Sequence, residues 1–128
     1  MLCLRLLLAV LMCVAQLTAK NFISPHELST LARAFHVFTG RALPVTSRGQ
    51  DRTHVLLRFD HRRRVDIGVA PFSSDGLWIQ DYLQKLKIPY LTFRAAIAGI
   101  ATGPHIHVGL PSHRLAKRVR PARRKRRR

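Results

Sequence analysis

The sequence predicts an α+β domain with a small, mainly antiparallel sheet and helices to one side of it. Two stretches place apolar residues three and four positions apart, which is the period of a helix with one buried face. Other stretches are short, rich in β-branched and aromatic residues and bounded by turn-forming residues, as is typical of strands. The main elements follow one another in the order α-β-β-α-β-β, and this order indicates the α+β class.

The first helix has clear start and stop signals. Ser24 can cap it, Pro25 suits its first position, and Glu27 completes an S-x-x-E capping box. Gly40 is expected to end it. Between these signals an apolar stripe at helical spacing predicts a packing element, formed by Leu28, Leu31, Ala32, Phe35 and Phe38.

Extended segments are expected next. Residues 43–47 form a short extended candidate, and the β-rich run 54–59 predicts a strand. Residues 65–70 alternate, so that Val65 and Ile67 should point to one face and Asp66 to the other.

The second half of the sheet domain begins at a turn over residues 73–76, which precedes a helix predicted at 77–87. Pro89 follows the end of this helix. Strands are predicted at 90–93 and 105–110, with a loop of small residues at 95–104 between them. The helix should turn inward Leu77, Ile79, Leu83 and Leu86, with Trp78 and Tyr82 at its flanks.

Residues 1–19 resemble an export signal, because Arg5 gives a positive start and an uncharged apolar run follows at 6–14. Ala15 and Ala19 are alternative cleavage positions. The domain is therefore expected at 20–113, in the periplasm or outside the cell, with no transmembrane segment once the signal is removed. Both cysteines lie in the signal, so the domain at 20–113 can form no disulfide. A bound metal would therefore be a useful source of stability for so small a core.

Strong positive charge is the next feature. The chain has 23 Lys and Arg against 6 Asp and Glu, a net charge of +17, and residues 114–128 hold many of these basic groups. Like charges in a block repel one another, so a disordered basic tail is predicted. Anionic envelope polymers are the partners expected after export, and a solvated tail without a partner is the alternative. The tail lacks the aromatic residues on which bases stack, which argues against nucleic acid.

Histidine and aspartate residues form the candidate chemical site. His105 and His107 are two positions apart on a predicted strand, so both imidazoles should lie on one face. Asp66 lies on the polar face of its own strand, and His61 lies in the connection before it. Two imidazoles and a carboxylate suit zinc and leave a fourth position open, while a further histidine can serve as acid or base. The alternative is a set of polar residues solvated on an open sheet face.

The segment 53–114 resembles the zinc peptidases of the D-alanyl-D-alanine carboxypeptidase and dipeptidase family. These enzymes belong to a wider group with the lysostaphin-type endopeptidases and the hedgehog signalling domain. The resemblance implies a small antiparallel sheet flanked by helices. In DHRRRVDIGV it implies His61 and Asp66 as zinc ligands, and in GPHIHVGLPS it implies His107 as the third ligand and His105 as the catalytic histidine.

The function implied is an exported zinc-dependent peptidase that hydrolyses peptide bonds in peptidoglycan stem peptides, as a carboxypeptidase or an endopeptidase. Arg48 and Arg52 are candidates for holding the carboxylate end of the substrate, and His54 competes with His61 as the first ligand. The alternative function is a non-catalytic module of the same fold that binds the cell wall or another anionic polymer.

Overall fold

The computed structural model describes residues 20–116, and it confirms the α+β class predicted from the sequence. Within these residues the chain forms three helices, a four-stranded sheet and a two-stranded sheet, and none of the helices is long and apolar enough to cross a membrane. The predicted export signal (1–19) and residues 117–128 of the predicted tail lie outside the described part. The elements are α2 (Pro25–Thr39), β1 (Val45–Arg48), α3 (Arg52–Leu57), β2 (Phe59–Asp60), β3 (Val65–Ile67), α4 (Ser74–Lys85), β4 (Tyr90–Phe93), β5 (His105–Val108) and β6 (His113–Arg114).

The helix α2 forms where the sequence places its start and stop signals. The Ser24 hydroxyl accepts a hydrogen bond from the Glu27 N–H, and the Glu27 carboxylate accepts one from the Ser24 N–H. Gly40 ends the helix in the left-handed region, with φ of 72°, and its N–H donates to the carbonyl of His36. The predicted capping box and stop are both confirmed.

The four-stranded sheet has the order β1-β3-β5-β4, and every neighbouring pair is antiparallel. Its register pairs Ser47 with Asp66, Asp66 with His107, and His107 with Leu91. Residues directly opposite one another on neighbouring strands point to the same face. The register therefore places these four side chains in one row across one face of the sheet.

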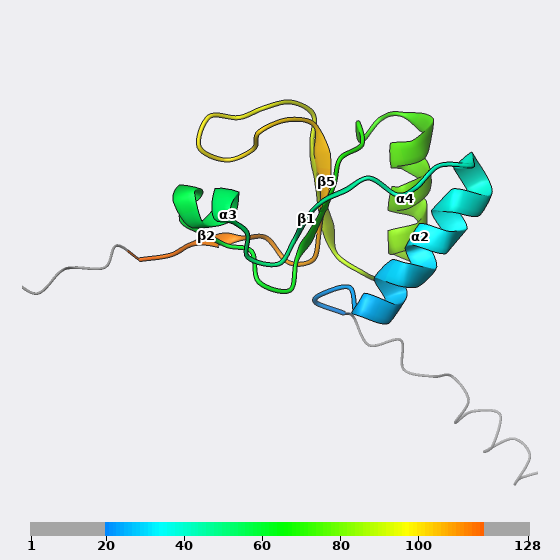
Figure 1. Cartoon of the computed structure of the whole chain (residues 1–128), viewed down its shortest axis with the longest axis horizontal. Coiled ribbons are helices and arrows are strands. Elements are labelled where there is room, and N and C mark those ends of the chain that lie inside the picture. Colours follow the sequence, from blue (N-terminus) through cyan, green and yellow to red (C-terminus); the bar gives the residue numbers. More distant parts are fainter. Residues whose placement is uncertain (1–19, 117–128) are drawn as a thin grey trace, which may run out of the picture.

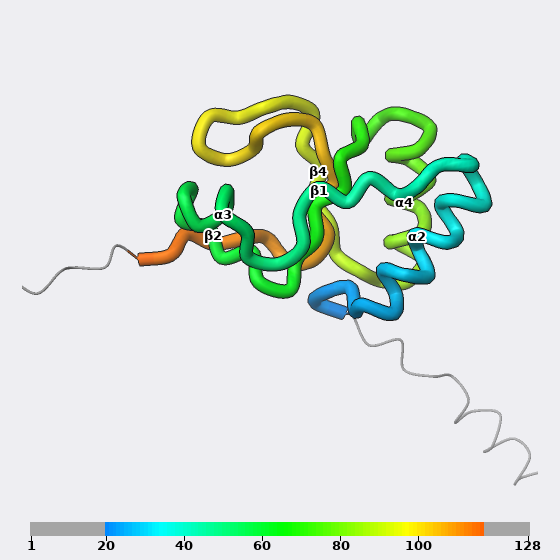
Figure 2. Tube along the Cα trace, viewed as in Figure 1, coloured from blue at the N-terminus to red at the C-terminus, as the bar shows by residue number. Residues whose placement is uncertain are grey.

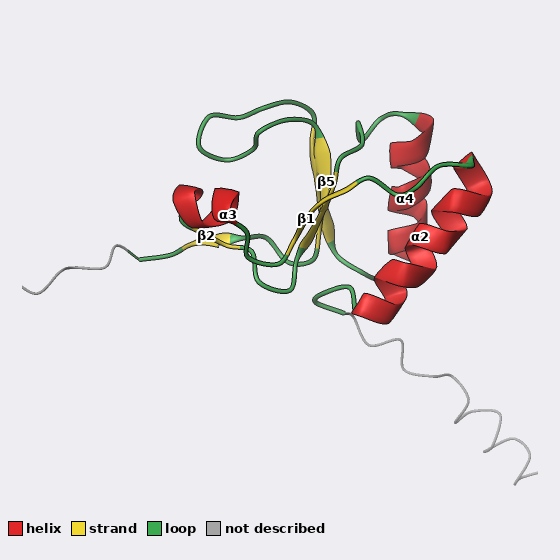
Figure 3. Cartoon of the chain, in the orientation of Figure 1, coloured by secondary structure: helices red, strands yellow, loops and turns green. Residues whose placement is uncertain are grey.

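The opposite face of the sheet packs against α2 and α4, which lie together on one side of it (Figures 1 and 3). The apolar residues of β3 and β5 alternate with the polar ones, so they point toward the helices, as predicted. Burial of each large aliphatic side chain contributes about 1.5–3 kcal/mol. The core comprises Ile23, Leu28, Leu31, Phe35, Val65, Ile67, Ile79, Leu83, Ile88, Ile106 and Val108.

The prediction of a strand at 54–59 is wrong for most of this segment, because the chain forms the short helix α3 there before β2 begins. Asp51 caps the helix, and its carboxylate accepts a hydrogen bond from the backbone N–H of His54 at 2.9 Å. The apolar residues that indicated a strand do not enter the core, since Val55 is 57% exposed and Leu56 is 72% exposed. Local capping and a solvent-facing position therefore outweigh β propensity here.

The helix α4 begins three residues earlier than predicted, at residue 74 rather than 77, and its predicted inner residues Ile79 and Leu83 are buried. Leu77, predicted to point inward, is 53% exposed, whereas Gly76, Ile79 and Leu83 are buried. The glycine is required by a close approach, because a Cβ at residue 76 would lie 2.3 Å from the carbonyl oxygen of Ala70.

A two-stranded sheet of β2 and β6 lies on the side of the main sheet away from α2 (Figure 1). It pairs Phe59 with Arg114, and beyond it the N–H of Leu115 donates to the carbonyl of Arg58 at 2.7 Å. Regular pairing thus continues into the first residues of the predicted tail segment, 114–128. The described chain starts beside α2 and ends beside β2, at opposite sides of the molecule (Figure 2).

The substitution Ser24→Ala should destabilise the protein by about 1 kcal/mol, because it removes the side-chain acceptor at the start of α2. Urea unfolding followed by circular dichroism measures this difference in the free energy of unfolding. Ser29→Ala, an exposed position inside the same helix, is the matched control and should be neutral or slightly stabilising. Equal stability of Ser24→Ala and the parent would contradict the capping role.

Candidate metal centre

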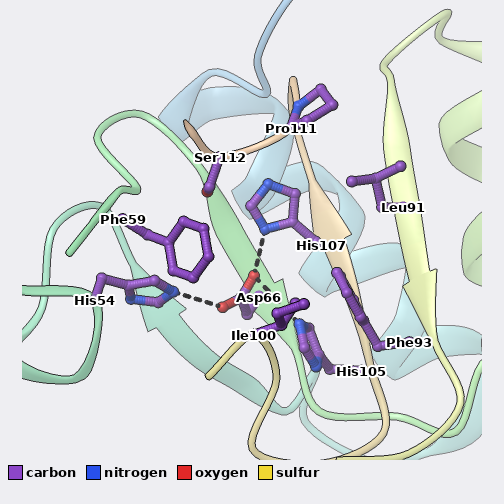
Figure 4. A pocket seen from close by; sticks show the side chains of 10 residues that line it. All are labelled: His54, Phe59, Asp66, Leu91, Phe93, Ile100, His105, His107, Pro111 and Ser112. Carbon is purple, nitrogen blue, oxygen red and sulfur yellow. Dashed lines mark hydrogen bonds and ion pairs between the residues drawn. The ribbon is translucent and has the colours of Figure 1, made fainter. Parts of the chain in front are cut away.

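The carboxylate of Asp66 lies at the centre of a cluster of histidines on the face of the sheet away from α2 and α4 (Figure 4). Its side chain is only 10% exposed, and a buried carboxylate is costly unless it is paired and hydrogen-bonded. Four imidazoles supply the pairing. The distances are 2.8 Å from His107 Nδ1 to Oδ1, 3.0 Å from His61 Nε2 to Oδ1, 3.4 Å from His54 Nε2 to Oδ2, and 4.0 Å from His105 Nε2 to Oδ1.

Different elements bring these side chains together. His107 is the direct strand partner of Asp66, and His105 lies two residues before it on β5. His61 follows β2 and is fully buried. His54 arrives from α3, where the Asp51 cap holds both its backbone and its ring, with 2.8 Å between Asp51 Oδ1 and His54 Nδ1.

Each imidazole is also fixed on its outer side. In each of these four histidines, one ring nitrogen faces an oxygen that can only accept a hydrogen bond. That nitrogen therefore carries a hydrogen. The second nitrogen of each ring then points toward Asp66. The outer contacts are His61 Nδ1 to Gly49 O at 2.7 Å, His105 Nδ1 to Gly103 O at 2.8 Å, His54 Nδ1 to Asp51 Oδ1 at 2.8 Å, and His107 Nε2 to Leu110 O at 3.1 Å.

This arrangement requires positive charge between the rings and the carboxylate. A neutral imidazole whose hydrogen is on the outer nitrogen would present a lone pair to the lone pairs of Asp66. Protonation of each ring removes this lone-pair repulsion, but it would stack two cations at His54 and His61, whose ring centroids are 3.6 Å apart. One metal ion bound by several rings would remove the repulsion without protonating them. An outer hydrogen bond on each ring is also typical of metal-binding histidines.

The pKa shifts of His61 and Asp66 agree with positive charge beside this carboxylate. Burial works against the charged form of His61, but hydrogen bonds with Asp66 and Gly49 outweigh it and raise the pKa of this histidine. Burial works toward a higher pKa for Asp66, but hydrogen bonds with His107 and His61 hold the pKa of this carboxyl well below its usual range. The surroundings thus favour a carboxylate with cationic charge beside it.

His54, His61 and Asp66 form a group that could hold a metal ion, because one ligand atom from each lies within 4.8 Å of the other two. Two imidazole nitrogens and one carboxylate oxygen are a donor set that suits zinc and leaves a position open. His107, predicted as the third ligand, contacts the same carboxylate oxygen as His61, Oδ1, but it is not a member of this group. The residues present therefore fit a metal, with ligand spacing that singles out His54, His61 and Asp66. The set His61, Asp66 and His107 is the one that the family resemblance implies, and it shares two of these residues.

A pocket opens over the cluster, and most of its remaining wall is apolar (Figure 4). The ring of Phe93 stacks on His105 with 4.6 Å between their centroids, which fixes the plane of this imidazole. Ser112 also lines the pocket, although its hydroxyl oxygen is buried. The apolar part is formed by Phe59, Leu91, Phe93, Ile100 and Pro111.

The structure gathers His61, Asp66, His105 and His107 in one cluster, in which His61 is fully buried and the other three line the pocket. It does not bring the two predicted arginines there. Arg48 lines a separate groove beside α2, and Arg52 is exposed at the start of α3. Sequence reasoning weighed His54 only as a substitute for His61, whereas both lie beside Asp66. Asp51 is of a residue type favoured at helix N-caps, and this is the signal that could have indicated a helix start just before His54.

Residues 20–128, purified without affinity histidines, should bind about one zinc ion per chain. Zinc at a hundredfold excess over its Kd should stabilise the fold by about 2.7 kcal/mol, because it binds only the folded state. His61→Ala should abolish both effects, since His61 belongs to both candidate sets. Elemental analysis and thermal unfolding measure them. His36→Ala, at an exposed position of α2, is the control, and absence of zinc from the reconstituted parent would contradict the site.

The third ligand is tested by the pair His54→Ala and His107→Ala. The spacing of the ligand atoms favours His54, so His54→Ala should lose most of the bound zinc. His107→Ala should retain more of it, because His107 contacts Asp66 from outside that group. Metal titration against a chelator measures both affinities. The opposite order would favour the set His61, Asp66 and His107 that the family resemblance implies.

Comparison with known proteins leaves the family of this chain open. No protein-family model matches it, and no solved structure matches it. Over 66 residues the chain is 41% identical to the ribosomal RNA large subunit methyltransferase M of Pseudomonas putida (strain GB-1). This match covers 49% of the chain but only 18% of the methyltransferase, so the chain spans less than a fifth of that relative.

Proposed function

We propose that this chain is an exported zinc-dependent peptidase that hydrolyses peptide bonds in peptidoglycan stem peptides. The observation that carries the proposal is the cluster of four imidazoles around the buried carboxylate of Asp66, each fixed by an outer hydrogen bond. The resemblance of segment 53–114 to zinc peptidases supports the choice of reaction. The signal-like residues 1–19 support export.

His61 and Asp66 would hold the metal, together with His54 or His107. Zinc in such a site supplies a Lewis acid that polarises a carbonyl and activates water at neutral pH. The protein's own contribution is to fix the donor atoms. The carbonyl of Gly49 orients His61, the carboxylate of Asp51 orients His54, and the strand register holds Asp66 in place.

His105 is suited to proton transfer. Its Nδ1 donates to the Gly103 carbonyl, so Nε2 is the nitrogen available to exchange a proton in the pocket. Stacking on Phe93 keeps the ring in this orientation. In the proposed reaction His105 Nε2 accepts a proton from the attacking water and passes it to the nitrogen of the leaving amine.

The apolar wall of the pocket supports this chemistry by excluding bulk water and so strengthening the electrostatic interactions inside. Phe59, Leu91, Phe93 and Ile100 line the same pocket as His54, His105 and His107. Neither Arg48 nor Arg52 lines this pocket, so no role in holding the substrate carboxylate is part of the proposal.

A non-catalytic module that binds an anionic polymer is the second candidate. The net charge of +17 favours it, because a strongly basic chain attracts polyanions. Envelope polymers are the partners expected for an exported chain. Ribosomal RNA is the second polyanion to test beside envelope polymers, since the methyltransferase that aligns with this chain over 66 residues is named for that substrate. Binding without cleavage would favour this candidate.

His105→Ala should keep zinc and fold while losing peptidase activity by roughly 10²- to 10⁴-fold, the contribution of a general acid or base. Stem peptides ending in D-alanine serve as substrates, and mass spectrometry follows the products. The control His36→Ala should cleave at the parent's rate. Equal rates for His105→Ala and the parent would contradict the proton-transfer role, and a zinc-loaded parent that cleaves no wall peptide would contradict the peptidase proposal.

A further inference from the structure

A groove of about 460 Å³ lies beside the start of α2, and it shares no lining residue with the pocket over the histidine cluster. Its volume is within the range of ligand-binding sites. Three segments form it: the chain that enters α2, the end of β1 and the turn that leads into β3. Part of its lining is apolar, including Phe22 and Pro25, and its charged side chains are Arg48, Arg63 and Arg64.

The three arginines of this groove differ in what they contact. Arg64 is buried, and its guanidinium donates to three main-chain carbonyls, so all three of its nitrogens are engaged. Arg48 and Arg63 are exposed. Neither of these two guanidinium groups forms an ion pair or a hydrogen bond within residues 20–116. They are therefore the groups in the groove that can bind a ligand.

The backbone and an aromatic ring hold Arg63 at the groove. Its φ of 63° lies in the left-handed region, which residues other than glycine enter only at an energetic cost. The guanidinium carbon of Arg63 lies 4.7 Å from the centroid of the Phe22 ring, and that of Arg64 lies 5.3 Å from the same ring. A cation over an aromatic face is a favourable contact that leaves the N–H donors of Arg63 without an acceptor.

The chain has no unpaired side-chain carboxylate to offer these arginines. All 6 of its acidic residues lie in the described part of the chain, and each is already paired elsewhere. The pairs are Glu27 with Lys20, Asp51 with His54, Asp60 with Arg62, Asp66 with the histidine cluster, Asp75 with Arg41, and Asp81 with Lys85. A second copy would bring the same paired set, so an anion that binds in the groove comes from a different molecule.

We infer that this groove binds an acidic peptide segment of a partner, with carboxylates on Arg48 and Arg63 and an apolar side chain against Phe22 and Pro25. The fork of N–H donors on a guanidinium matches the two oxygens of a carboxylate. The apolar lining favours a peptide over a phosphate polymer, because phosphate groups would leave that lining uncovered. This binding site goes beyond the proposed peptidase function, since the histidine cluster does not line the groove.

Fluorescence anisotropy of a labelled peptide in which two glutamates flank a leucine tests the site. Full chains are compared in about 0.15 M salt, which screens the diffuse attraction of a strongly basic chain. Arg48→Gln and Arg63→Gln should each weaken binding about tenfold, through loss of a charged hydrogen bond. Arg52→Gln removes the same charge outside the groove and should change the affinity less than about twofold.

Arg63→Gly separates binding from folding. Glycine suits the positive φ at this position, so this variant should keep or raise the Tm while it binds the peptide about tenfold more weakly. A variant that is at least as stable as the parent cannot lose affinity by unfolding.

Equal weakening by Arg48→Gln, Arg63→Gln and Arg52→Gln would overturn the inference, because charge anywhere on the chain would then account for binding. No binding by the parent, or equal binding of a peptide with glutamines in place of the glutamates, would overturn it as well. Tripolyphosphate is the competing probe. If it binds through Arg48 and Arg63 while the peptide does not, the groove recognises phosphate and the peptide assignment is wrong. These measurements need neither zinc nor peptidase activity, so their outcome is separate from that of the metal centre.

Discussion

The buried carboxylate of Asp66 is the constraint on which the rest of this structure depends. A charge removed from water needs opposite charge and hydrogen bonds within a few ångströms. Here the partners are imidazoles, and their outer nitrogens are fixed by Gly49, Asp51 and the carbonyls of the β5 region. The cluster can be neutralised by protons on the rings or by one metal ion, and a metal ion would avoid stacking two cationic rings at His54 and His61, whose centroids are 3.6 Å apart.

Segments far apart in the chain converge to meet this demand. The strand pairing of β3 with β5 brings Asp66 against His107 across 41 positions of sequence. The helix α3 and the turn after β2 add the remaining histidines from one side, and Arg64 closes the other side by holding the carbonyl that orients His107. Two layers result, with the apolar face of the sheet packed on helices and the polar face built around one carboxylate.

A domain of this size gains from such a centre. Fewer than 100 residues bury a modest apolar core, and small domains often depend on a disulfide or a metal. The described residues contain no cysteine, so a disulfide cannot serve. A metal held by side chains from α3, the turn after β2 and β3 would join three segments that share few apolar contacts, because α3 has no buried residue of its own. Metal binding and folding would then be coupled.

Local sequence determined the elements whose signals act over a few residues. The capping box at Ser24 and the stop at Gly40 define α2, and alternation puts His105 and His107 on one face with Val108 on the other. Asp66 on the polar side of a strand was predictable for the same reason. These features need only the geometry of one helix or one strand.

Tertiary structure decided the rest. The sequence around Val55 and Leu56 predicts a strand, but this segment is a capped helix that faces solvent. That helix places His54 beside Asp66. The position of Arg48 relative to the pocket depends on strand register. The position of Ser112 depends on the buried Arg64, whose side chain bonds to the carbonyls of Leu110 and Pro111, 46 and 47 positions later in the sequence. No periodicity within a short stretch encodes such distances, because they are set by packing between segments rather than within them.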